Sequence, residues 1–189
     1  MLPRLLIHFF VRPQKKHRMK KFLVLIAIVT SSFTTIADDW KTITLVDKVT
    51  VSLPGTAVED KSKGIPMQKA VLPDSTEIDA FALDYSTFGM NEQMLQQMAG
   101  TEAFKQQIET GVSMQPGMKL IKNESGKYND KYILYKMALQ VDKDGYKGTI
   151  NQQTVFYKQY GITIIYKPGQ KGEDTALRDK LFNSLKIAD

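Results

Sequence analysis

The sequence has no cysteine and only two histidines, His8 and His17, among its 189 residues. The absence of cysteine excludes disulfide bonds. Because both histidines precede residue 38, the rest of the chain has neither imidazole nor thiol. This excludes Ser-His-Asp and Cys-His catalysis and removes the usual zinc ligands. No glycine-rich phosphate loop is present either. We therefore expect residues 38–189 to have no cofactor and no catalytic residues of these kinds.

Residues 38–189 also lack an excess of positive charge. The whole chain carries 26 Lys and Arg residues against 20 Asp and Glu residues, a net charge of +6. Residues 1–37 hold seven of the basic residues and none of the acidic ones, which leaves 19 basic and 20 acidic residues for 38–189. Because the remaining net charge is −1, nucleic acid is not an expected partner.

The amino-terminal segment has the pattern of a secretory signal peptide. The basic stretch Met19–Lys21 precedes an apolar run, Phe22–Val29, and the small residues Thr35 and Ala37 suit the −3 and −1 positions of a cleavage site. The signal is complete from Met19 onward, so we interpret residues 1–18 as an extension that precedes the true start.

A membrane anchor is the alternative to a cleaved signal. The uncharged run of residues 22–37 is 16 residues long, shorter than the roughly 20 apolar residues that span a bilayer. We therefore expect residues 1–37 to be an extension and cleaved signal peptide, and residues 38–189 to be a single globular domain. That domain is expected to be soluble, periplasmic or secreted, with no stable membrane anchor after cleavage.

Alternating apolar and polar residues predict a series of short strands. The expected strands cover residues 42–45, 49–53, 65–72, 77–85, 118–123, 131–141, 147–158 and 162–167, with residues 55–64 as a loop. Asp142–Gly145 reads as a hairpin turn, since its spacing does not fit a calcium-binding loop. In the first hairpin, a three-residue loop at 47–49 would place Leu45 opposite Val51.

Two segments have helical periodicity. The first covers residues 91–110, with Asn91 as a cap and Gly111 as a stop, and Gly100 within it favours a kink or break. Its apolar stripe places Met94 and Met98 against the sheet and buries them.

The second helical segment covers residues 173–186, where Leu177, Leu181 and Leu185 repeat every four residues and Arg178 and Lys180 point towards water. Strands grouped before and after one helix indicate an α+β fold with a mostly antiparallel β-sheet flanked by helices.

This order of elements resembles a known family. A leading hairpin that ends in Leu53-Pro54, a mid-chain helix, a meander that ends in Tyr160–Tyr166, and a closing helix with the sequence Leu181–Ile187 are similar to the PsbP-like family. The resemblance implies an α/β/α sandwich. It also implies an extracytoplasmic or lumenal domain that assists a larger assembly and has no catalytic activity of its own.

Methionines form the first candidate site. Met90, Met94 and Met98 are four residues apart, and Met114 and Met118 follow. Thioethers on one helical face can bind cuprous copper, a soft ion. Methionine also commonly fills adaptable cores, and we expect this structural role for Met94 and Met98.

Carboxylates form the second candidate site. Glu77 and Asp79 share one face of a predicted strand, and Asp84 has the opposite parity. Carboxylate pairs can catalyse glycosidic cleavage, but most such pairs are solvated strand ends. The tyrosines between residues 128 and 166 suit a contact surface or, as we favour, packing in the sheet.

These observations favour a non-catalytic exported envelope protein that binds a partner protein in the cell envelope or assists an assembly. Two alternatives stay open. One is a metal-handling protein that binds cuprous copper through methionines, and the other is a carboxylate-dependent enzyme.

We predict that the mature protein begins at Asp38, because cleavage after Ala37 satisfies the small-residue pattern. Amino-terminal sequencing of the protein recovered from the cell envelope checks this. A mature form that keeps Phe22–Val29 would contradict the cleaved signal peptide.

Overall fold

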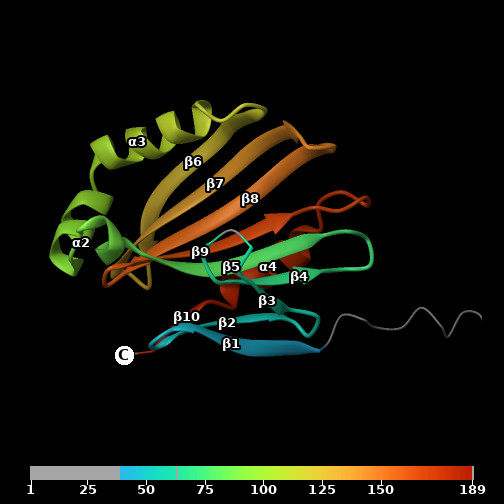
Figure 1. Ribbon diagram of the computed structural model, residues 1–189, viewed down its shortest axis with the longest axis horizontal. Helices are drawn as coiled ribbons and strands as arrows, with labels where there is room; N and C mark the ends of the chain where they lie inside the picture. Colours follow the sequence, from blue (N-terminus) through green and yellow to red (C-terminus); the bar gives the residue numbers. More distant parts are fainter. Residues whose placement is uncertain (1–38, 63, 189) are drawn as a thin grey trace, which may run out of the picture. The chain divides into compact units, whose positions relative to one another are not determined.

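The computed structural model describes residues 39–62 and 64–188, so the predicted signal peptide and its cleavage site lie outside the described residues. Two antiparallel sheets dominate these residues (Figure 1). The smaller sheet has the order β1-β2-β10 and contains β1 (Trp40–Val46), β2 (Val49–Pro54) and β10 (Lys186–Ile187). Within the described part of the chain, no helix is both long and apolar enough to cross a membrane.

The larger sheet has seven strands in the order β3-β4-β5-β9-β8-β7-β6. Its strands are β3 (Val58–Asp60), β4 (Met67–Val71), β5 (Glu77–Asp84), β6 (Met118–Tyr128), β7 (Tyr132–Lys143), β8 (Tyr146–Tyr157) and β9 (Tyr160–Lys167). Every neighbouring pair is antiparallel. The α+β class that the sequence predicts is therefore confirmed.

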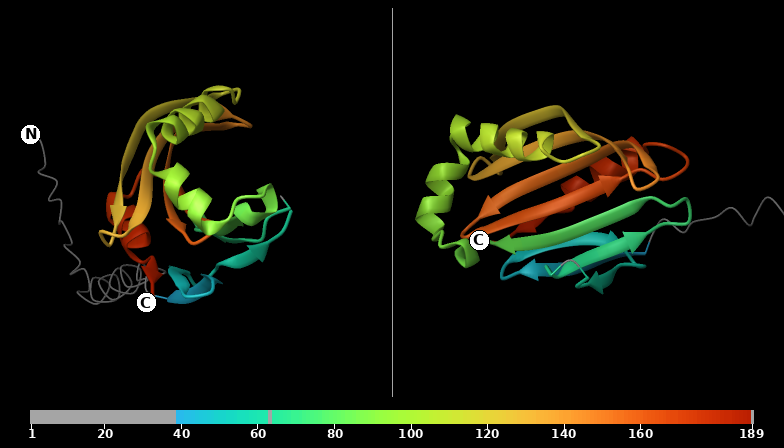
Figure 2. Two further views of the ribbon diagram at one scale, coloured as in Figure 1. Left: turned by 90° about the vertical axis from the view of Figure 1, so that its left-hand side faces the viewer. Right: turned by 45° about the horizontal axis from the view of Figure 1, so that its top comes forward.

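Helices lie on both sides of the larger sheet. A 3-10 turn, η1 (Tyr85–Phe88), leads into α2 (Glu92–Ala99) and α3 (Glu102–Ser113), and α4 (Thr175–Asn183) follows the last long strand. The sheet curves around the side that carries α2 and α3 (Figure 2). The small sheet and α4 cover the other side. The arrangement is therefore a sandwich in which the larger sheet lies between a layer of two helices and a mixed layer, made of the small sheet and α4.

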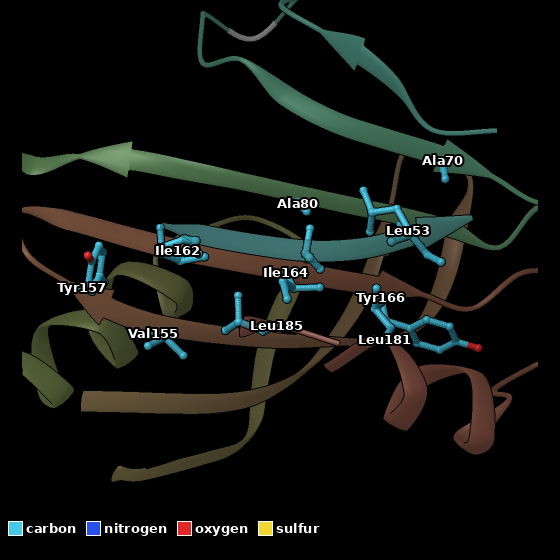
Figure 3. Close-up of a cluster of buried hydrophobic side chains, with 13 residues drawn as sticks. Leu53, Ala70, Ala80, Val155, Tyr157, Ile162, Ile164, Tyr166, Leu181 and Leu185 are labelled. Atoms are coloured by element: carbon cyan, nitrogen blue, oxygen red, sulfur yellow. The ribbon is translucent and has the colours of Figure 1, made fainter. Parts of the chain in front are cut away.

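The main core lies between the larger sheet and this mixed layer (Figure 3). Alternate residues of β5 and β9, such as Ile78, Ala80 and Ile164, point into it and have no exposed surface. They meet Leu53 from β2 and Leu181 from α4, which are equally buried. Two smaller clusters lie on the opposite face, beneath α2 and α3.

The first hairpin has the predicted facing but not the predicted loop. A two-residue turn, Asp47-Lys48, joins the strands, and a bulge at Leu45 shifts their register. Ile43 therefore lies opposite Val51, and the expected three-residue loop at 47–49 is wrong. The bulge adds the one residue that keeps the apolar side chains of both strands on the same face.

The predicted break in the long helix is confirmed. The α2 helix ends at Ala99, and α3 begins after Thr101, whose hydroxyl accepts a hydrogen bond from the Phe104 N–H. The predicted stop at Gly111 is wrong, because α3 continues to Ser113. One glycine inside a helix costs about 1 kcal/mol, and in this last turn Val112 packs against the cluster of Met137, Leu139 and Val141.

The sequence pattern does not predict two short strands. β3 lies within the predicted loop 55–64, and β10 follows α4 at the end of the chain. β10 pairs with β2, and the backbone carbonyl of Leu185 accepts a hydrogen bond of 2.6 Å from the Tyr128 hydroxyl. These contacts hold the end of the chain in the fold.

The α4 helix docks on the core through Leu181, which is buried, and Leu177, which is partly buried, as predicted. The helix is shorter than the predicted range of 173–186, and Leu185 is buried two residues beyond its end, before β10. Lys180 is exposed, as expected, whereas Arg178 is only partly exposed because it pairs with Glu173 and Asp179. Apolar contact therefore docks the helix on the core, whereas the ion pairs of Arg178 lie within the helix and the residues just before it.

Replacing Leu181 with Ala is expected to lower the free energy of unfolding by about 2–5 kcal/mol, because the leucine side chain is fully buried in the main core. Met114→Ala is the control, since this side chain is 76% exposed, and it should change stability little. Denaturant unfolding curves measure both. Equal curves for Leu181→Ala and the unchanged protein would contradict the docking of α4.

Candidate functional site

A groove of about 560 Å³ lies between α3 and the curved sheet. Its apolar side is formed by Ile108 and Val112 of α3 together with residues of four strands. These strand residues are Met118, Met137, Leu139, Val141, Ile150 and Ile165. The main polar groups lie on the strands beyond the helix, where Glu77, Asp79, Gln152 and Lys167 line the groove.

Polar contacts tie both α2 and α3 to the sheet. The Tyr135 hydroxyl donates a buried hydrogen bond of 2.8 Å to the carbonyl of Ala99, at the end of α2. The Asn123 amide donates to the Glu109 carboxylate at 3.0 Å.

At the far end, Gly117 has a φ of 75°, and a Cβ atom there would lie 2.4 Å from the backbone oxygen of Asp142, near the end of β7. Glycine is therefore required where α3 returns to the sheet.

The polar side of the groove contains a small network of ion pairs. The Glu77 carboxylate accepts hydrogen bonds from the Lys69 ammonium at 3.1 Å and from the Lys167 ammonium at 2.8 Å. The two lysines come from β4 and β9, the strands on either side of β5. Lys167 also lies 4.5 Å from the ring centre of Tyr146. Four strands thus supply one connected polar surface.

The network fixes the charges of its members. Burial raises the pKa of the Glu77 carboxyl, but the hydrogen bonds and charges of Lys167 and Lys69 outweigh it, so the pKa lies below its ordinary value of 4.5. The hydrogen bond to Glu77 raises the pKa of the Lys69 ammonium above 10.5, against the effect of burial. Glu77 is therefore ionised at neutral pH and is a poor proton donor.

The candidate carboxylates do not gather at one point. Glu77 and Asp79 both line the groove, as their shared parity predicts. Asp84 instead accepts a hydrogen bond of 2.8 Å from the Ser86 N–H and caps η1. Across the residues described here, no group of three or more acidic, histidine or cysteine side chains is placed to hold a metal ion.

The candidate methionines gather at a second, smaller pocket of about 380 Å³, lined by Met90, Met94, Met98 and Gln97. Met98 and Met90 are partly buried, but Met94 is 51% exposed. The predicted burial of Met94 is therefore wrong.

The reason is the rotation of α2. Its buried residues are Leu95 and Ala99, one position further along than Met94 and Met98, which corresponds to about 100° around the helix. Because α2 ends at Ala99, its facing is independent of the Phe104 and Ile108 stripe on α3. A single apolar stripe drawn through both helices therefore misplaces Met94, which is exposed, and overstates the burial of Met98, which is partly buried.

The tyrosines serve mainly in packing, as favoured from the sequence. Tyr135, Tyr157 and Tyr166 are at most 5% exposed. Tyr166 accepts a hydrogen bond from the Asp174 N–H at the start of α4.

Comparison with known proteins identifies the fold. No protein-family model and no curated protein sequence matches this chain. Among solved structures, cyanobacterial PsbP (CyanoP) from Synechocystis sp. PCC 6803 superposes with a TM-score of 0.52 at 10% identity, covering 83% of this chain and 99% of that protein. The fold is PsbP-like.

A second solved structure, protein PA94 of unknown function from Pseudomonas aeruginosa, matches with a TM-score of 0.44 at 11% identity and covers 76% of this chain. The match with CyanoP alone confirms, at the level of the fold, the PsbP-like resemblance seen in the sequence.

Sequence reasoning identified Glu77 but missed its partners. Lys69 and Lys167 are 8 and 90 residues away from it along the chain. The alternation of β4 and β9 places both lysines on a defined face, but only the strand order brings those faces beside β5.

The Glu77 network predicts a specific pH dependence of stability. Because its folded pKa is lowered, Glu77 stabilises the fold fully above pH 4.5 and loses this effect as the pH falls through the folded value. Glu77→Gln should therefore cost roughly 1 kcal/mol near pH 7, between the values for exposed and buried ion pairs. The difference should shrink in acid.

Unfolding curves measured from pH 7 to pH 3 test this expectation. Glu124→Gln is the control, since the Glu124–Lys122 pair is more than half exposed on both sides and should contribute little at any pH. A cost for Glu77→Gln that stays constant with pH would show that the charge of Glu77 is not the source of its effect.

Proposed function

We propose that residues 38–189 form a non-catalytic binding domain that is exported to the cell envelope, where the groove beneath α3 receives a segment of a partner protein. The groove itself is the observation that carries this proposal, because it is the larger concave surface and combines apolar and hydrogen-bonding groups. Binding sites in proteins commonly have this combination and a volume of about 300–1,000 Å³.

The charge of the groove favours a protein segment over a small anion or cation. Three carboxylates and three ammonium groups lie at or beside it: Glu77, Asp79, Asp144, Lys69, Lys143 and Lys167. Their charges balance, and Glu77 already pairs with two of the lysines. A neutral lining with apolar walls suits apolar side chains flanked by backbone amide groups.

The state of the carboxylates supports a role without catalysis. A general acid needs a pKa near the working pH, whereas the pKa of Glu77 is lowered by its lysine partners. Asp84 is engaged in a cap. The predicted signal peptide supports the location, and the PsbP-like resemblance implies a role in assisting a larger assembly.

The proposal predicts where the partner touches this protein. A photo-crosslinking amino acid at Gln115, an exposed residue of the groove, should trap one discrete partner in intact cells. The same group at Lys41 or Ala176, exposed positions of β1 and α4 on the other side of the sheet, should trap little. Mass spectrometry of the adducts identifies the partner and the segment in contact.

A filled groove provides the matched test. Gln152→Trp places a large ring on the groove floor and should abolish the adduct at Gln115, whereas Lys41→Trp should not. Circular dichroism and thermal melting show that both variants fold. Adducts that form equally from Lys41 and Ala176, or that persist in Gln152→Trp, would refute the groove as the partner site.

A further inference from the structure

We propose that the pocket formed by Met90, Met94 and Met98 binds one soft monovalent metal ion, cuprous copper or its analogue silver, through thioether sulfur atoms. This site is separate from the groove beneath α3 and does not depend on its proposed partner. Its lining contains only the three methionines and Gln97.

Local structure holds the three methionines on one side of α2. Met90 immediately precedes the cap, and its N–H donates a hydrogen bond of 3.2 Å to the carbonyl of Tyr85. Asn91 accepts a hydrogen bond of 2.9 Å from the Met94 N–H and so starts the helix. Met94 and Met98 are then neighbours one turn apart, since residues four apart lie on the same helical face.

The packing of α2 leaves these methionines available. The buried contacts of the helix are made by Leu95 and Ala99, so the fold does not require the Met94 side chain for its core. Met94 is 51% exposed, and Met90 and Met98 pack only partly against the cluster around Leu95. An exposed, flexible thioether between two partly fixed ones can move onto an ion without unpacking the helix.

The chemistry of the lining selects the class of ion. Thioethers are neutral, soft ligands that favour cuprous copper over the hard cations magnesium and calcium. The pocket lining contains no carboxylate that would attract a hard divalent cation and no lysine or arginine that would repel a positive ion. Residues 38–189 also contain no cysteine or histidine that would compete for the same metal.

Silver provides the direct test, because it has the charge and ligand preference of cuprous copper and stays in one oxidation state in air. The exported protein with 13C-labelled methionine methyl groups would be titrated with silver nitrate in chloride-free buffer. One equivalent should shift the methyl signals of Met90, Met94 and Met98. The signals of Met114, which is 76% exposed, and of buried Met137 should not move.

Variants provide the matched control. Competition with a cuprous chelator should show that Met94→Leu weakens copper binding by roughly tenfold or more, as expected for the loss of one ligand. Met114→Leu should bind as the unchanged protein does. Because Met94 is half exposed, Met94→Leu should also keep the melting temperature, so any loss of binding is not a loss of folding.

Three results would overturn the proposal. The first is that silver shifts no methionine signal at one equivalent. The second is that Met114 responds as strongly as Met94, which shows unselective binding to exposed thioethers. The third is that Met94→Leu combined with Met98→Leu keeps the full affinity, in which case the methionines form only an apolar surface.

Discussion

The pairing of β5 with β9 is the constraint on which the rest of the molecule depends. These strands contribute side chains to both faces of the larger sheet, and their register places Ile78 beside Tyr166 on one face and Glu77 beside Lys167 on the other. The first face needs a continuous apolar cover. β2, β10 and α4 provide this cover, although they come from opposite ends of the described chain.

The second face is covered only in part, and this difference creates the candidate site. α2 and α3 pack over Tyr135, Phe156 and Met137, where the strands carry apolar residues. Where β5 and β9 carry Glu77, Asp79 and Lys167, a helix would bury charges at a high cost in desolvation. Ion pairs between neighbouring strands satisfy these groups instead, and the space beside α3 stays open.

Much of this fold could be predicted from the sequence because it depends on local periodicity. The alternation in β7 predicts its buried face from Tyr135 to Val141, and the leucine repeat predicts the docking of α4. Asp144-Gly145 predicts the β7–β8 turn, where both residues have positive φ values. Each of these features is determined by residues that lie close together along the chain.

Features that depend on distant partners could not be predicted in the same way. β10 is only two residues long and forms through its antiparallel pairing with the edge of β2. The facing of α2 is set by Tyr135 and Phe156, which belong to strands that follow it in the chain. The Lys69–Glu77–Lys167 network requires the strand order, and a pattern of period two carries no information on that order.

The error in the facing of α2 has a consequence for function. Had Met94 faced the sheet, it would have been buried as Leu95 is, and its sulfur atom would have been closed to solvent. With leucine and alanine in the core, Met90 and Met98 pack against its edge, and Met94 is left half exposed. The core explains the packing of Met90 and Met98 but not the presence of an exposed thioether beside them, and this is the ground for proposing a metal site in the pocket.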